Sequence, residues 1–125
     1  MANESSNPCA VLSTEAELET ALADSFERPL VLLKHSEWCD RSQRVIEAAL
    51  GELETWATEI GCRVLVVQNH PELSDAVARL LNIRHETPQV VVIRNGQVTW
   101  HAAHFDITSH ALRRAIGMEL GAGRK

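Results

Sequence analysis

The residues with the clearest chemical potential are three cysteines, Cys9, Cys39 and Cys62. Cys39 is the most informative because it lies between an aliphatic run at residues 30–34, which predicts a buried strand, and the longest predicted helix. Unpaired N–H groups in the first turn of a helix favour a thiolate over a thiol. The position of Cys39 is therefore typical of a nucleophile, although free cysteine is also among the most often buried residue types.

The other two cysteines are expected to have supporting roles. Cys62 begins a predicted inner strand and should be buried, whereas Cys9 lies in the first predicted strand and could act as a distant resolving thiol. An odd number of cysteines without a C-x-x-C pair does not fit a small secreted disulfide framework. We therefore expect a cytoplasmic protein whose thiols are mostly reduced.

Composition narrows the class of protein. The chain has 125 residues, 45% of them hydrophobic, and a net charge of −5. This length fits one globular domain, and the acidic balance argues against binding to nucleic acid or to an anionic membrane. No stretch approaches the roughly 20 apolar residues of a membrane helix, and the N-terminus has no features of a signal peptide.

Periodicity and turn signals predict the element order β-α-β-α-β-α-β-β-α. A capping box at Thr14 begins the first helix, Pro71 begins the third, and Asn95-Gly96 predicts a hairpin. The long second helix is expected over residues 40–60, and a last helix should start after Thr108 and end at Gly121. This order predicts an α/β domain of three layers, α/β/α, with a mixed central sheet. The domain should span residues 8–121, between a disordered tail at residues 1–7 and a short tail at residues 122–125.

A Thr-Pro pair adds a second candidate feature. Thr87 and Pro88 come just before the predicted strand at residues 90–93. Together with Cys39 and the order of elements, they resemble the thioredoxin superfamily, in which a cis-proline loop packs against the active cysteine. The resemblance implies a thioredoxin-like fold, a cis Thr87–Pro88 peptide, and a backbone before the proline that pairs with the substrate.

Three segments resemble one family more closely, the YtxJ-like monothiol bacilliredoxins of the bacillithiol system. They are Lys-His-Ser at residues 34–36 with Cys39 and Ser42, Arg-His-Glu-Thr-Pro-Gln at residues 84–89, and Trp-His-Ala-Ala-His at residues 100–104. The resemblance implies that Cys39 is the nucleophile and that Ser42 replaces the second cysteine of a C-x-x-C motif. Asp40 departs from the family pattern, which usually has proline after the cysteine.

A single active thiol limits the chemistry. With Ser42 at the resolving position, Cys39 can attack a mixed disulfide and retain the small thiol, but another thiol must release it. The resemblance implies S-thiolated client proteins as partners and bacillithiol as a co-substrate, with no bound cofactor. Two alternatives stay open: a glutaredoxin-like protein that uses another low-molecular-weight thiol, and a thioredoxin-fold binding module without turnover, which the carboxylate of Asp40 favours.

Histidine and tryptophan residues complete the candidate site. His35 and His85 precede the two predicted active loops and could act as a base or as hydrogen-bond partners. Trp38, beside Cys39, could contact a partner protein. His101 and His104 form an H-x-x-H pattern, but an odd spacing on a strand directs side chains to opposite faces, so we expect no metal site.

Overall fold

The computed structural model describes residues 9–36 and 40–123. The elements follow in the predicted order, β-α-β-α-β-α-β-β-α. The strands are β1 (Ala10–Val11), β2 (Leu30–His35), β3 (Gly61–Val66), β4 (Gln89–Arg94) and β5 (Gln97–Ala103). The helices are α1 (Glu15–Asp24), α2 (Asp40–Glu54), α3 (Pro71–Leu81) and α4 (Ser109–Gly123), with the short 3₁₀ helix η2 (His104–Asp106) between β5 and α4.

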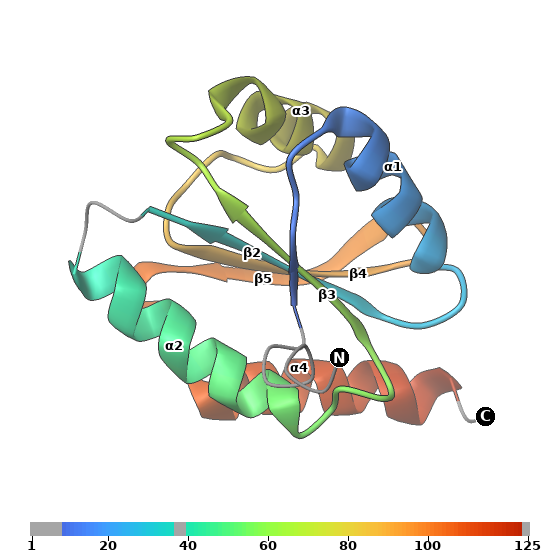
Figure 1. Ribbon diagram of the computed structural model, residues 1–125. Coiled ribbons are helices and arrows are strands. Elements are labelled where there is room, and N and C mark those ends of the chain that lie inside the picture. Colours follow the sequence, from blue (N-terminus) through green and yellow to red (C-terminus); the bar gives the residue numbers. More distant parts are fainter. Residues whose placement is uncertain (1–8, 37–39, 124–125) are drawn as a thin grey trace, which may run out of the picture.

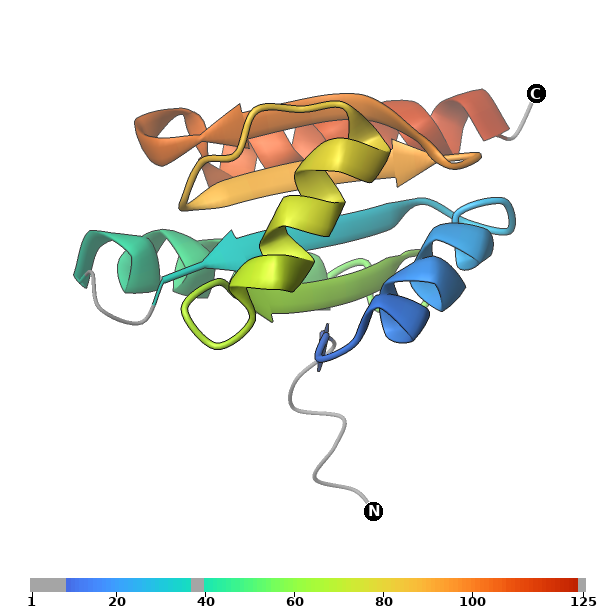
Figure 2. The same cartoon turned by 90° about the horizontal axis from the view of Figure 1, so that it is seen from above.

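The strands form one mixed sheet in the order β1-β3-β2-β4-β5. Strands β1, β3 and β2 run parallel, whereas β4 is antiparallel to both β2 and β5. Helices α1 and α3 cover one face of the sheet, and α2 and α4 cover the other (Figures 1 and 2). The structure therefore has the predicted three layers. Among the described helices, none combines the length and the apolar character needed to cross a membrane.

Strand β2 contributes side chains to both hydrophobic cores. Leu30 and Leu32 point into the core under α1 and α3, whereas Val31 and Leu33 point into the core over α2 and α4. Both faces of β2 are thus covered, which explains why its sequence is a continuous aliphatic run rather than an alternating one. The same alternation places the side chain of Lys34, the next residue, on the α1 and α3 face.

Two helix ends differ from the sequence-based expectation. Helix α2 ends at Glu54 rather than at residue 60, and residues 55–57 continue as tighter turns in which each N–H bonds the carbonyl three residues earlier. The β-branched residues Thr55 and Thr58 favour this early end, because they form helix poorly. Helix α4 continues two residues past Gly121 to Gly123.

Cys9 and Cys62 form a disulfide bond, so the expectation that the thiols are mostly reduced is wrong for this pair. The physical reason is the register of β1 on β3, in which Ala10 lies opposite Arg63. The preceding residues, Cys9 and Cys62, are then neighbours, with their Cα atoms 4.6 Å apart. Both side chains are buried, as expected for Cys62. The bond fastens β1, an edge strand of two residues, to the interior of the sheet.

Candidate functional site

The two segments that carry the candidate site lie at one end of neighbouring strands. Lys34 on β2 pairs with Gln89 on β4, so the antiparallel register places Pro88 beside His35. Helix α2 begins at Asp40. Cys39 and Trp38 themselves lie outside the described residues, but β2 and α2 flank them as predicted. The topology therefore brings the strand that leads to Cys39 next to the Thr87–Pro88 loop.

The Thr87–Pro88 peptide bond is cis, the geometry that the family resemblance implied. Pro88 is buried, and its carbonyl accepts a hydrogen bond from the backbone N–H of His104 (3.1 Å). His104 adopts a positive φ of 57°, which directs its backbone into this contact at the start of η2. The proline loop is therefore fixed from the β5 side as well as by the register of β4.

Ser42 is completely buried and joins the two ends of the segment that contains Cys39. Its Oγ accepts a hydrogen bond from the backbone N–H of Ser36 (3.1 Å) and lies 3.2 Å from Nδ1 of His35. When Nδ1 carries no proton, the Ser42 hydroxyl donates to it. His35 and Ser42 are thus brought together, in a contact that holds the end of β2 against the first turn of α2.

His85 takes part in a separate cluster on the opposite face of the sheet. Its Nδ1 lies 2.7 Å from Nζ of Lys34 and 3.0 Å from Oγ of Ser74, a buried residue of α3. Sequence reasoning missed Lys34 and Ser74 as site residues. A lysine at the end of an otherwise aliphatic buried strand was the available signal, because a buried amine needs a partner.

Burial determines the charge state of the cluster. It lowers the pKa of Lys34 from 10.5 to about 8, although the carboxylates of Asp75 and Glu86 oppose the change. Partial burial, followed by the charge of Lys34, lowers the pKa of His85. At neutral pH this arrangement favours an ammonium group on Lys34 that donates to the unprotonated Nδ1 of a neutral His85.

The lowered pKa of Lys34 predicts how stability depends on pH. Between pH 8 and 10.5 the unfolded chain binds more protons than the folded one, so the free energy of unfolding should rise with pH in this window. The full rise should approach about 3 kcal/mol, since one pKa unit corresponds to about 1.4 kcal/mol. Apart from the Cys39 thiol, few other side chains titrate in this window, because the chain has no tyrosine and only one other lysine. Urea titrations at several pH values should show the rise, and Lys34→Met should abolish it. A wild-type curve as flat as that of the variant would contradict the prediction.

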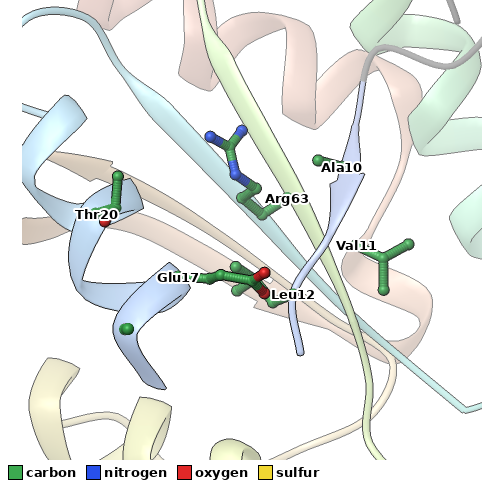
Figure 3. Close-up of a pocket in the computed structure, with 7 residues that line it drawn as sticks. Ala10, Val11, Leu12, Glu17, Thr20 and Arg63 are labelled. Carbon is green, nitrogen blue, oxygen red and sulfur yellow. The ribbon is translucent and has the colours of Figure 1, made fainter. Parts of the chain in front are cut away.

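The hollows on the described surface include two of similar volume. The first, of about 330 Å³, adjoins the proline loop and is lined by residues 101–106 and Glu86, whose Oε1 lies 3.1 Å from Nε2 of His104. The second, of about 310 Å³, lies between β1 and α1 (Figure 3). Its two charged residues have local partners: Glu17 accepts from the N–H of Thr14, and Arg63 donates to the carbonyl of Cys62. Of these two, the first adjoins the candidate site.

The histidines of the H-x-x-H pattern occupy different elements. His101 lies on β5, whereas His104 begins η2. Within residues 9–36 and 40–123, no group of three or more His, Cys, Asp or Glu side chains could hold a metal ion.

Comparisons with known proteins agree with this geometry. The family model of the monothiol bacilliredoxin BrxC matches residues 10–112. A thioredoxin-fold protein that has been proposed to be an oxidoreductase is 30% identical, with a TM-score of 0.76 over 86% of this chain and 92% of the other. Thioredoxins of Malassezia sympodialis and Arabidopsis thaliana (thioredoxin O2) are 17% and 18% identical, with TM-scores of 0.73 and 0.70. Both matches cover 90% of this chain, and 91% and 94% of the respective thioredoxins. The fold is therefore thioredoxin-like.

Proposed function

The chain belongs to the monothiol bacilliredoxin family, which together with its fold supports a role in thiol–disulfide exchange, and we propose that it removes bacillithiol from S-thiolated proteins through Cys39. We place this activity in the cytoplasm, where S-thiolated client proteins and the small thiol would meet. Bacillithiol is a co-substrate in this proposal, and no bound cofactor takes part.

The observation that carries the proposal is the register of β2 on β4. It places Pro88 beside His35, so a client backbone at the Thr87–Pro88 loop would lie next to the segment that contains Cys39. Ser42 supports the monothiol character, because its hydroxyl occupies the position of a resolving thiol and is engaged with Ser36 and His35. Trp38 would add an aromatic contact to the client.

The reaction follows from having one thiol. The Cys39 thiolate attacks the bacillithiol sulfur of a protein–S–S–bacillithiol disulfide, a bond forms between these two sulfurs, and the bond to the client sulfur breaks. The client leaves as a thiolate and takes a proton from water. A second thiol then attacks the Cys39 mixed disulfide, forms a new disulfide with the bacillithiol, and restores Cys39. Ser42 cannot perform this second step because an alcohol does not form a disulfide.

Mass spectrometry of the adduct tests the proposal. A protein carrying one bacillithiol disulfide is mixed with the reduced enzyme, and the same client carrying glutathione serves as the matched control. We expect bacillithiol on the peptide that contains Cys39, recovery of the client thiol, and release of the adduct when free bacillithiol is added.

Other outcomes would select the alternatives. Equal or faster transfer of glutathione would contradict the choice of thiol and favour a glutaredoxin-like protein that uses another low-molecular-weight thiol. A Cys39 adduct that free thiols do not release would indicate a binding module without turnover. Absence of any adduct on Cys39 would overturn the assignment of the nucleophile.

A further inference from the structure

Lys34 is a buried cationic residue that the proposed reaction does not use. Its side chain has 0% exposure and meets His85 together with Ser74 of α3. Helix α3 covers this face of the sheet (Figure 2). A buried ammonium group is costly unless it is paired or hydrogen-bonded. A methionine or leucine would fill the same core without this cost, so the amine points to a role other than packing.

The partner of Lys34 lies two residues before Thr87. The Nζ atom is 2.7 Å from Nδ1 of His85, and Oγ of Ser74 approaches the same ring nitrogen at 3.0 Å. These contacts connect β2 and α3 to the loop that leads into Pro88. Lys34 thus contacts the proline loop through His85, while its own strand, β2, continues in the sequence toward Cys39.

The other side of the same loop is held by His104. Its Nε2 lies 3.1 Å from the carboxylate of Glu86, and its backbone N–H donates to the carbonyl of Pro88. His85 and Glu86 are therefore fastened to opposite flanks, one to β2 and α3 and the other to η2. The residues on both sides of Thr87, Glu86 and Pro88, are therefore each held by a contact with His104.

We propose that Lys34 is a positioning residue, which holds the backbone of Thr87 in place for a client polypeptide through its hydrogen bond with His85. This inference rests on the proposed function for the identity of the client, but the contact itself does not depend on it. In this role Lys34 acts through His85 on the client-binding loop rather than on the reacting sulfur atoms. Its effect is on where the client backbone binds relative to Cys39.

The protonation state of the pair makes the contact sensitive to acid. Two nitrogen atoms 2.7 Å apart share one proton, so the contact forms when His85 is neutral and breaks when both groups are charged. The charged groups that face the amine are Asp75 on α3 and Glu86 in the loop, and both favour the ammonium form. Protonation of His85 should therefore release the loop from β2 while leaving the contact of Glu86 with His104.

Kinetics of a matched pair of variants test the positioning role. Lys34→Met keeps the length of the side chain and removes its charge, and Arg79→Met removes an exposed cation from α3 as the control. Displacement of a bound group by about 1 Å can cost up to a hundredfold in rate, and we expect kcat/KM for the S-bacillithiolated client to fall at least about tenfold in Lys34→Met, mainly through KM. Alkylation of Cys39 by iodoacetamide should keep its wild-type rate. His85→Gln, which retains an acceptor for the amine, should recover more activity than His85→Leu.

Nuclear magnetic resonance provides a readout that is independent of activity. The chain contains two lysines, so the Lys34 signals are identified by a single variant. We expect an unprotonated Nδ1 on His85, a rise in the pKa of His85 in Lys34→Met, and faster exchange of the amide hydrogen of Thr87. If these effects are not observed, or if Lys34→Met has the wild-type KM, the positioning role is overturned. If wild-type protein shows the coupling but no dethiolation, the proposed function fails and the positioning role stands.

Discussion

Replacing Cys39 by serine should eliminate dethiolation, leaving only the exchange that occurs without the protein. The expected loss is complete because the reaction begins with a thiolate, whereas a serine hydroxyl stays protonated at neutral pH and cannot form a disulfide. The measurement is the recovery of client thiol over time from an S-bacillithiolated protein, with protein-free buffer as the blank. The variant should also carry no bacillithiol adduct after incubation with the client.

The matched control removes the other two cysteines together. The double variant Cys9→Ala/Cys62→Ala should retain dethiolation within about twofold. Substitutions away from the proposed site that spare the reacting groups leave the contacts of the transition state unchanged. Both residues are buried, bonded to each other, and placed where β1 joins β3 rather than at the Thr87–Pro88 loop. The assay should be run well below the unfolding temperature of the variant. Comparable losses in this variant and in Cys39→Ser would contradict the assignment of Cys39 as the essential thiol.

Local signals account for how well the fold could be predicted. The Thr14 capping box is present in full, Pro71 begins α3, and Asn95 and Gly96 have the positive φ values, 56° and 77°, of a tight hairpin turn. Each of these features depends on residues within a few positions of one another. Their agreement along the chain was enough to predict the order of elements and the three layers.

The features that sequence reasoning missed depend on contacts between distant segments. The Lys34–His85 contact joins residues 51 apart, and the Cys9–Cys62 bond joins residues 53 apart. A strand of two residues such as β1 is too short to show a periodic pattern from which its register could be predicted. The pairing of Cys9 with Cys62 could therefore not be derived from the sequence. The resemblance to a family supplied the cis peptide at Thr87–Pro88, which spacing alone could not.

Removal of the Cys9–Cys62 bond should cost about 4 kcal/mol in the free energy of unfolding. A cross-link between residues 53 apart restricts the unfolded chain, and the chain-entropy relation gives a value between the 3 kcal/mol of a 15-residue loop and the 4.7 kcal/mol of a 100-residue loop. For a domain of this size the unfolding temperature should fall on the order of 10–20 °C. Urea or guanidinium titration with and without a reductant measures the difference.

The measurement is specific when it is made in the Cys39→Ser variant, because Cys9 and Cys62 are then the only cysteines in the chain. Both are buried, so a reductant should reach them only when β1 separates from β3, and reduction of the folded protein should be slow. A denaturant should accelerate the reaction by exposing the bond. An unfolding midpoint that is the same with and without reductant would contradict the bond. Slow reduction of the folded form would in turn explain how a buried disulfide persists in a chain whose Cys39 must stay reduced to react, because the reductant has access to one sulfur and not to the other two.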